Sequence, residues 1–154
     1  MKKENIIKYG TPILSVILVA LIGTIFTNMG MEWFKTLNKP SQWLIDAVIP
    51  IVWTIIYSLF IIYLIYLVKE EKLNKKMFIL LVINGFLNVL WCLVYFALNS
   101  LLGGQILIVL NLIASILLIK EIFKNNRVWG YVIMIYPIWL SIATCLNLAV
   151  WIMN

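Results

Sequence analysis

The sequence contains no histidine and only two cysteines, and charged residues make up just 12% of its 154 residues. The missing histidine removes the commonest metal ligand, the usual axial ligand of haem and the usual general base at neutral pH. Cys92 and Cys145 both fall inside apolar runs. We therefore predict that both thiols are buried and behave as small hydrophobic groups, which excludes a redox motif or a metal site built from them.

Apolar residues, in contrast, are abundant. They make up 64% of the chain, and the mean hydropathy is +1.06, whereas an ordinary soluble domain is about 45–50% apolar. A helix that rises ~1.5 Å per residue needs about 20 residues to cross a hydrocarbon core of ~30 Å. The composition therefore predicts an all-α integral membrane bundle that occupies residues 1–154 as a single domain. In such a protein the net charge of +6 reflects the orientation of the chain in the membrane and its contact with anionic headgroups. It does not indicate a nucleic-acid partner.

Charged clusters divide the chain into uncharged runs that are long enough for transmembrane helices. The uncharged run 77–119 would extend about 65 Å as one helix, about twice the hydrocarbon thickness, so it must form two spans. Asn99-Ser100 and Gly103-Gly104 mark the predicted break, and Pro137 is predicted to kink the last span. The five predicted transmembrane helices cover about residues 9–30, 47–68, 77–98, 102–120 and 128–152.

The polar interval between the first two predicted spans, residues 31–46, is too long for a tight turn and too aromatic for a linker. Lys39-Pro40 disfavours a helix immediately before the proline. We predict that this interval folds onto the membrane surface.

The distribution of positive charge predicts the orientation of the chain. Of the 12 Lys and Arg residues, only Lys35 and Lys39 lie on the side of that interval, and the other ten lie on the side of the N-terminus. By the positive-inside rule, the N-terminus of this multi-pass protein is cytoplasmic and the C-terminus lies outside.

Two amide side chains interrupt the apolar run in the middle of the chain. Asn84 and Asn88, with Trp91 and Tyr95, have spacings of i, i+4, i+7 and i+11, which place all four on one face of a helix. Because an unpaired amide is costly in lipid, this face must contact other protein, trapped water or a ligand. Hydrogen bonding between helices is the alternative to a binding role for the two amides.

Three tryptophans lie too deep for an interfacial belt. Counting from the predicted ends of the spans, Trp53 and Trp91 both lie roughly 10 Å below the outer surface, with Trp139 somewhat deeper. Helix packing would explain any one of them alone, but three beside two amides favour a ligand pocket in the outer half. By the same count this half also holds Thr24, Ala143 and Asn147. The belt itself is formed by the remaining tryptophans, Trp33, Trp43, Trp129 and Trp151.

Three blocks of sequence resemble the TspO/MBR family, the tryptophan-rich sensory proteins related to the mitochondrial translocator protein. The first is WFKTLNKP at residues 33–40, followed by Trp53 and Tyr57. The second is N-x-x-W-x-x-x-Y-F at residues 88–96. The third, Y-x-x-W-x-S-x-A-T-x-L-N at residues 136–147 followed by Ala149, Trp151 and Asn154, resembles the final helix of the family almost position for position.

The resemblance implies a five-helix bundle, often a homodimer, that binds tetrapyrroles such as protoporphyrin IX and haem or similar flat hydrophobic molecules. The ligand would occupy a pocket in the outer half, and its anionic propionates would meet Lys35 or Lys39. The tetrapyrrole is then a ligand, no further cofactor is required, and no metal-binding or catalytic residue is assigned. The ligand-binding residues implied are Thr24, Trp33, Pro40, Trp53, Tyr57, Asn84, Asn88, Trp91, Tyr136, Trp139, Ala143 and Asn147.

Three functions remain open at this point: a tetrapyrrole receptor or sensor, a transporter of such molecules, and a light-dependent enzyme that degrades porphyrin. Five helices cannot form an even inverted repeat, and no ionisable residue lies deep in a predicted span, which argues against a coupled transporter. Asp46 is the only carboxylate near a span on the outer side, and it lacks a partner for acid–base catalysis. A photochemical reaction would need only a tryptophan near the ligand.

Overall fold

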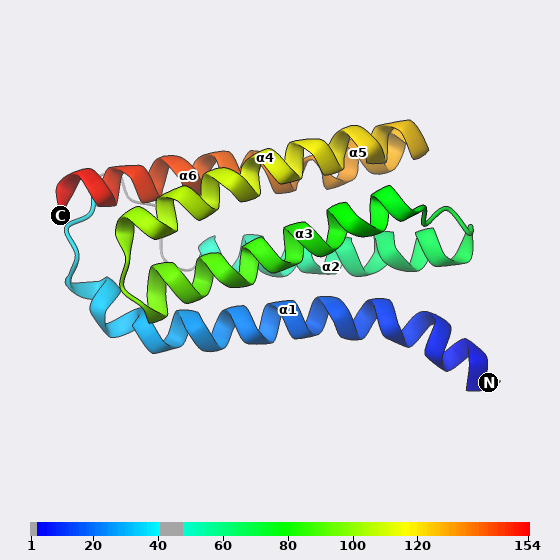
Figure 1. Cartoon of the computed structure of the whole chain (residues 1–154), viewed down its shortest axis with the longest axis horizontal. Coiled ribbons are helices and arrows are strands. Elements are labelled where there is room, and N and C mark those ends of the chain that lie inside the picture. Colours follow the sequence, from blue (N-terminus) through cyan, green and yellow to red (C-terminus); the bar gives the residue numbers. More distant parts are fainter. Residues whose placement is uncertain (1–2, 41–47) are drawn as a thin grey trace.

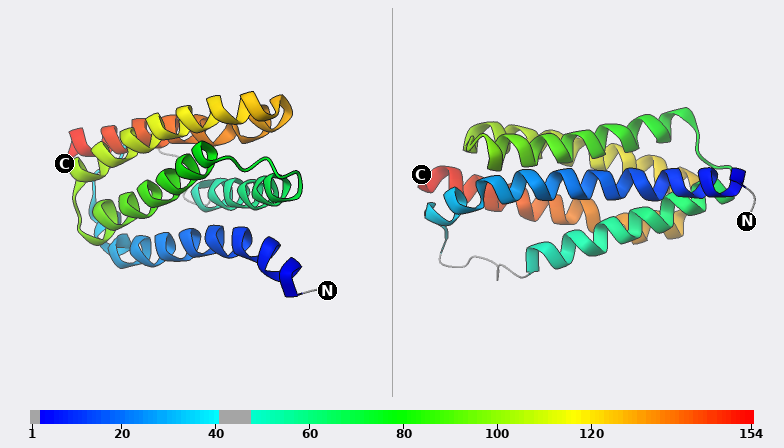
Figure 2. Two further views of the ribbon diagram at one scale, coloured as in Figure 1. Left: turned by 45° about the vertical axis from the view of Figure 1, so that its right-hand side comes forward. Right: turned by 90° about the horizontal axis from the view of Figure 1, so that it is seen from below.

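The computed structural model describes residues 3–40 and 48–154, with side chains from Tyr9 onward. Five helical stretches in this part of the chain are long and apolar enough to cross a membrane, which confirms the predicted all-α membrane bundle. They lie side by side, and the two termini are at opposite ends of the bundle (Figures 1 and 2). The elements are α1 (Lys3–Thr36), α2 (Val48–Lys69), α3 (Lys75–Cys92), the π-helix η1 (Leu93–Ala97), α4 (Leu101–Asn125), α5 (Arg127–Ile133) and α6 (Ile135–Met153).

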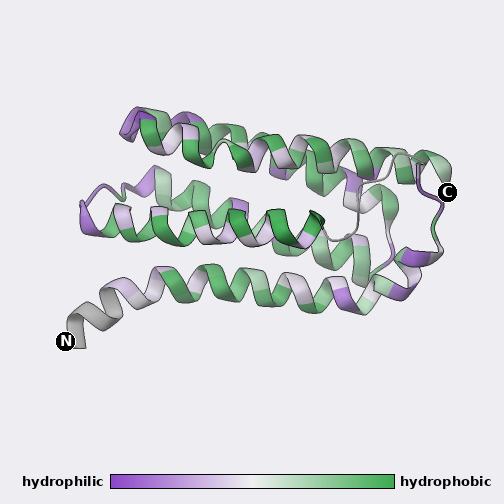
Figure 3. Cartoon of the chain, turned by 180° about the vertical axis from the view of Figure 1, so that it is seen from behind, coloured by the Kyte–Doolittle hydropathy of each residue, from purple (hydrophilic) through white to green (hydrophobic). Residues whose placement is uncertain are grey.

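The surface of the bundle has the polarity expected of a chain that is surrounded by lipid. Large apolar side chains are exposed along the helices, for example Ile25, Phe86 and Ile113. Figure 3 shows that apolar residues fill the length of the helices, while hydrophilic residues gather toward the ends of the bundle. The chain is therefore an integral, multi-pass membrane protein.

Polar side chains define where three of the helices begin. Asn74, Ser100 and Asn126 each accept a hydrogen bond from main-chain N–H groups in the first turn of α3, α4 and α5 respectively, which satisfies donors that have no partner within the helix. The predicted break between the third and fourth spans is confirmed at Asn99-Ser100, where Asn99 has a φ of 54°. Gly103-Gly104 lies inside the first turn of α4 instead of in the break.

The first helix is longer than the sequence predicts. The expected end at residue 30 is wrong, because α1 continues to Thr36. Lys35 Nζ lies 2.7 Å from Glu32 Oε1 across one turn of this extension, and after Pro12, inside α1, the next proline in the sequence is Pro40. The interval predicted to fold onto the membrane surface therefore begins as helix. Its later part, which includes Trp43 and Asp46, lies outside the described residues.

The last span contains the interruption predicted from Pro137. The α5 helix ends at Ile133 and α6 begins at Ile135. Proline has no N–H to donate to the carbonyl four residues earlier, so the hydrogen bonding is broken at Ile133. The interruption is therefore displaced by about one turn from the proline that causes it.

The two cysteines lie in different surroundings. Cys92 is buried, as predicted, but Cys145 is exposed on α6, so the prediction of burial for Cys145 is wrong. The buried face of α6 includes Leu140, Ala143 and Asn147, and a residue two positions from Ala143 points away from that face at ~3.6 residues per turn. An apolar run does not by itself show which side faces lipid.

The arrangement of the helices leaves a space between α2 and α3. The α1 helix packs against α2, α3 and η1, and α4 packs against α3, η1, α5 and α6. The α2 helix packs on α1, α5 and α6, whereas the main chains of α2 and α3, which follow each other in the chain, lie too far apart for close packing. Long side chains bridge the two helices, including Tyr57, whose hydroxyl donates to Asn88 Oδ1 at 2.9 Å.

The face predicted from Asn84, Asn88, Trp91 and Tyr95 is buried, with each side chain 9% exposed or less. Close contacts hold its C-terminal end in place. A Cβ at Gly30 would overlap the main chain of Phe96, so only glycine lets α1 approach η1 this closely. This contact brings α1 against the segment that carries Tyr95 of the face and the neighbouring ring of Phe96.

Candidate functional site

Two cavities occupy the space between α2 and α3. The first, which we call the Trp91 cavity, has a volume of about 610 Å³ and lies toward the end of the bundle that carries the C-terminus. The second, which we call the Ser15 cavity, has a volume of about 540 Å³ and lies toward the opposite end. Small-molecule sites typically enclose about 300–1,000 Å³, so each has the size of a binding site.

Flat aromatic rings form one wall of the Trp91 cavity. Trp53 on α2 stacks on Trp91 of α3, with ring centroids 6.4 Å apart and planes 29° from parallel. Tyr57 stacks on Trp53 at 5.6 Å, and Tyr95 stacks on Trp91 at 5.8 Å. These nearly parallel rings extend the aromatic wall from one helix to the next. Such a wall suits a planar, conjugated ligand.

Buried N–H groups without partners are the main polar feature of this cavity. Among the described residues, no hydrogen-bond acceptor is found for Trp91 Nε1, Trp139 Nε1, Asn88 Nδ2 or Asn147 Nδ2. All four side chains line the cavity and are 9% exposed or less. Because an unpaired buried donor costs about 1–3 kcal/mol, the cavity favours a ligand that brings acceptor atoms.

Two lysines also line the Trp91 cavity. Lys35 pairs with Glu32 at 2.7 Å, and the two side chains are 61% and 88% exposed. Lys39 Nζ lies 4.3 Å from the centre of the Phe34 ring. Both cations are therefore placed where a negatively charged end of a ligand can meet them.

The last residue of the sequence holds the segment that carries Lys39. The main-chain N–H of Asn38 donates to Asn154 Oδ1 at 2.9 Å, and Asn154 Nδ2 donates back to the Asn38 carbonyl at 3.0 Å. The same Nδ2 lies 2.8 Å from the Val150 carbonyl. Asn154 thus ties the segment after α1 to the end of α6. The sequence blocks reach this part of the chain but assign no role to Asn154.

Eight of the twelve residues predicted to bind ligand line the Trp91 cavity, so the structure brings most of the predicted set together. The eight are Thr24, Trp53, Tyr57, Asn88, Trp91, Trp139, Ala143 and Asn147.

The other four predicted residues lie elsewhere. Asn84 and Tyr136 line the Ser15 cavity instead, because they lie beyond the hydrogen bond between Tyr57 and Asn88. Trp33 and Pro40 line neither cavity. Trp33 belongs to the extension of α1 and packs edge-on against Tyr95, with ring centroids 6.1 Å apart, so it supports the wall from behind.

Sequence reasoning missed two polar residues of α1 in this wall. Thr27 and Asn28 line the Trp91 cavity beside Thr24. Their spacing of i, i+3 and i+4 in an otherwise apolar run is the signal that would have found them. The described residues contain no group of three His, Cys, Asp or Glu side chains that could hold a metal ion.

Comparison with known proteins gives consistent matches over nearly the whole chain. The sequence model of the TspO/MBR family matches residues 12–152. A protein of Archaeoglobus fulgidus named tryptophan-rich protein TspO is 28% identical over 97% of this chain and 99% of its own length. The protein of the same name from Chlorobaculum tepidum is 28% identical over 88% of this chain and 89% of its own. Protein CrtK of Rhodobacter capsulatus is 26% identical over 79% and 78%.

Proposed function

This chain belongs to the TspO/MBR family of membrane proteins, and from that premise we propose that it is a receptor-type protein that binds a tetrapyrrole, such as protoporphyrin IX or haem, in the Trp91 cavity. The observation that carries the proposal is the combination of four unpaired buried N–H donors with stacked tryptophan rings. A porphyrin offers a large flat face for the rings and acceptor atoms for the donors.

The magnitudes favour the buried donors over the lysines as the source of affinity. An exposed ion pair is worth ~0–1 kcal/mol, and Lys35 is largely exposed. A hydrogen bond between neutral groups is worth about 0.5–1.5 kcal/mol, and the four unpaired donors are all buried. We therefore assign the lysines to the orientation of the propionates and the donors to affinity. A metal-free porphyrin needs no axial ligand from the protein.

Titration of the purified protein with protoporphyrin IX tests this function. We expect saturable quenching of tryptophan fluorescence. Trp139→Phe or Trp53→Phe should remove more of this quenching than Trp129→Phe, because Trp129 packs on Tyr63 and Tyr66 toward the other end of the bundle. The dimethyl ester of the porphyrin keeps its acceptor atoms but loses the charge, so it should bind within about tenfold of the free acid.

A matched pair of bulky substitutions on α6 locates the site. Ala143 is buried and lines the cavity, so Ala143→Phe should block porphyrin binding by filling the space. Cys145→Phe adds similar bulk on the exposed face of the same helix and should leave binding unchanged. If Ala143→Phe binds porphyrin as tightly as the parent, the ligand does not occupy this cavity.

Transport across the membrane is a second candidate, because the two cavities share Trp53, Tyr57 and Asn88 as lining residues. The hydrogen bond between Tyr57 and Asn88 would then separate two halves of one path. Flux of porphyrin into vesicles that contain the protein tests this candidate. Binding without flux, in vesicles where the protein is folded, rules it out.

Light-dependent degradation of the ligand is a third candidate, favoured by the tryptophans that line the Trp91 cavity. An indole close to an excited porphyrin is a potential electron donor. Loss of porphyrin absorbance under illumination, compared with the same complex in the dark and with Trp139→Phe, separates degradation from simple binding.

A further inference from the structure

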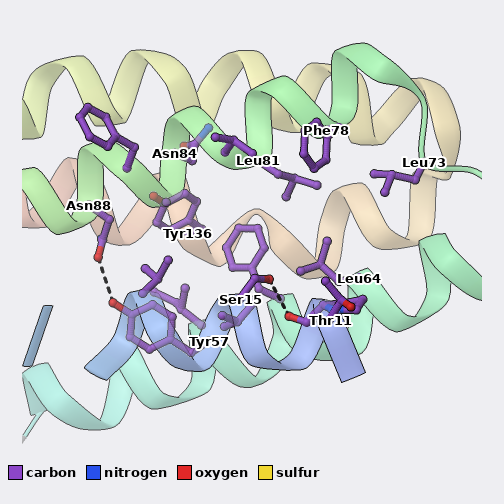
Figure 4. Close-up of a pocket in the computed structure, with 18 of the residues that line it drawn as sticks. Thr11, Ser15, Tyr57, Leu64, Leu73, Phe78, Leu81, Asn84, Asn88 and Tyr136 are labelled. Atoms are coloured by element: carbon purple, nitrogen blue, oxygen red, sulfur yellow. Dashed lines mark hydrogen bonds between the residues drawn. The ribbon is translucent and has the colours of Figure 1, made fainter. Parts of the chain in front are cut away.

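The Ser15 cavity is an elongated slot that extends away from the proposed tetrapyrrole site. Its lining on α2 runs from Trp53 to Val68 and on α3 from Phe78 to Asn88. At ~1.5 Å per residue, these stretches span about 22 Å and 15 Å along the helix axes. Figure 4 shows Leu73, Leu81 and Asn84 among the residues spread along the slot. Its length suits a linear chain better than a flat ring system.

Along its α2 and α3 walls, the polarity of the slot runs opposite to that of the bilayer. On these walls Leu64, Val68 and Leu73 line the end near the charged turn between α2 and α3, while on α1 Thr11 lies at this end and the Ser15 hydroxyl donates to the Pro12 carbonyl (Figure 4). The side-chain amide of Asn84 lies at the other end, near the middle of the bundle, beside Tyr136, whose hydroxyl donates to Asn111 Oδ1 at 3.1 Å (Figure 4). A phospholipid that entered from the surface would place its apolar chain against these polar groups. The slot fits a molecule that enters whole, with its polar end toward the middle of the membrane.

Asn84 determines which polar group the slot accepts. This side chain is only 4% exposed, and its Nδ2 donates to the Leu80 carbonyl at 2.8 Å. Its Oδ1 has no donor anywhere in the part of the chain that the structure describes. A ligand that reaches this lone acceptor must donate a hydrogen bond, and a carboxylate cannot do so.

The slot also differs from the Trp91 cavity in charge. No Asp, Glu, Lys or Arg lines it among the described residues, whereas Lys35 and Lys39 line the Trp91 cavity. Burying an ion there without a partner would be costly. The ligand of the slot is therefore uncharged.

We propose that the Ser15 cavity is a second binding site, for a neutral long-chain alcohol whose hydroxyl donates to Asn84 Oδ1 and whose hydrocarbon chain lies along the slot toward Leu73. The alcohol enters sideways from the bilayer, because Ser15 on α1 and Phe78 and Val82 on α3 line the cavity and are exposed. Near its N-terminus α1 leans away from the other helices (Figure 1). The proposal does not rest on the tetrapyrrole proposal, although the two cavities adjoin and share Trp53, Tyr57 and Asn88 as lining residues.

Binding of tritiated oleyl alcohol to the purified, full-length protein tests the proposal. We expect saturable binding that unlabelled oleyl alcohol displaces and that its methyl ether displaces at least tenfold less well, since the ether has no O–H to donate. Asn84→Leu should weaken binding of the alcohol at least tenfold and remove the preference over the ether. Equal competition by the ether, or no saturable binding, would overturn the proposal.

Two further variants separate this site from the Trp91 cavity. Ser15→Trp should fill the slot and abolish binding of oleyl alcohol while protoporphyrin IX binding persists. Ala143→Phe should leave alcohol binding unchanged. If Ala143→Phe abolishes alcohol binding, the alcohol occupies the Trp91 cavity and the proposal is wrong. If Asn84→Leu fails to fold, the Ser15→Trp variant still tests where the alcohol binds. The comparison with the ether on the parent protein still tests the need for a donated hydrogen bond.

Discussion

At the scale of single residues, the two cavities differ in the kind of unpaired polar atom that belongs to each. The Trp91 cavity presents N–H donors, including Trp139 Nε1 and Asn147 Nδ2, whereas Asn84 presents a lone acceptor to the Ser15 cavity. Donors favour ligands that bring acceptor atoms, and the lone acceptor favours an uncharged ligand that donates. Of the two asparagines on one face of α3, Asn84 lines the Ser15 cavity alone, whereas Asn88 lies where the two cavities meet and lines both.

The first prediction contrasts these two asparagines. Asn88→Leu should weaken protoporphyrin IX binding by about fivefold, the equivalent of one lost hydrogen bond of about 1 kcal/mol. Asn84→Leu should change porphyrin affinity much less, because Asn84 lines the other cavity. Fluorescence titration measures both. If the two variants lose porphyrin affinity equally, the division between the cavities is wrong.

At the scale of elements, the contact between α1 and η1 positions much of the aromatic wall. Phe34 of α1 packs on Tyr95 at 6.0 Å and on Phe96 at 5.4 Å, measured between ring centroids. Gly30 allows this approach because a Cβ would overlap the main chain of Phe96. A main-chain atom cannot move aside as a side chain can.

The second prediction follows from that overlap. Gly30→Ala should separate α1 from η1, destabilise the protein by about 1–3 kcal/mol and weaken porphyrin binding. Thermal unfolding in detergent measures the stability. Gly10→Ala is the matched control, because a Cβ at Gly10 has no neighbour within 4 Å, so alanine there should leave stability equal or slightly higher. An equal melting temperature for Gly30→Ala and the parent would contradict the close approach.

The third prediction concerns the tie between α6 and the segment after α1. Asn154→Ala removes the paired hydrogen bonds to the main chain of Asn38, so the segment that carries Lys39 should be held less firmly and protoporphyrin IX should dissociate faster. Stopped-flow fluorescence measures the dissociation rate. Asn125→Ala, which removes a 3.2 Å hydrogen bond to the Lys72 carbonyl toward the opposite end of the bundle, is the control and should leave the rate unchanged. Equal rates in both variants would show that the tie does not hold the ligand.

The sequence predicts the elements better than it predicts their contacts. Uncharged runs and helical spacing suffice for the helices and for the buried face of Asn84 and Trp91, because both follow from the exclusion of polar groups from lipid. The π-helix at Leu93–Ala97 and the burial of only one cysteine were not predictable in this way. They depend on which helix packs where. For the same reason, the helix face that Asn84 shares with Asn88 and Trp91 placed it in the predicted pocket, whereas Tyr57 from α2 sets the boundary between the cavities.

At the scale of the whole molecule, the distribution of charge distinguishes the two ends of the bundle. Near one end, the turn between α2 and α3 and the segment around the α4–α5 junction carry seven cations: Lys69, Lys72, Lys75, Lys76, Lys120, Lys124 and Arg127. The end that holds the Trp91 cavity carries Lys35 and Lys39. The positive-inside rule then predicts that the Trp91 cavity lies toward the outer surface and the Ser15 cavity toward the cytoplasm.

The fourth prediction tests this orientation with two matched Glu→Cys variants. Glu70 and Glu32 are both exposed and lie at opposite ends of the bundle. In intact cells an impermeant thiol reagent should label Glu32→Cys and not Glu70→Cys, and permeabilised cells should label both. The parent protein controls for its own thiols, because Cys92 is buried and Cys145 lies within α6. Labelling of Glu70→Cys alone in intact cells would reverse the orientation, and the tetrapyrrole would then reach the Trp91 cavity from the cytoplasm.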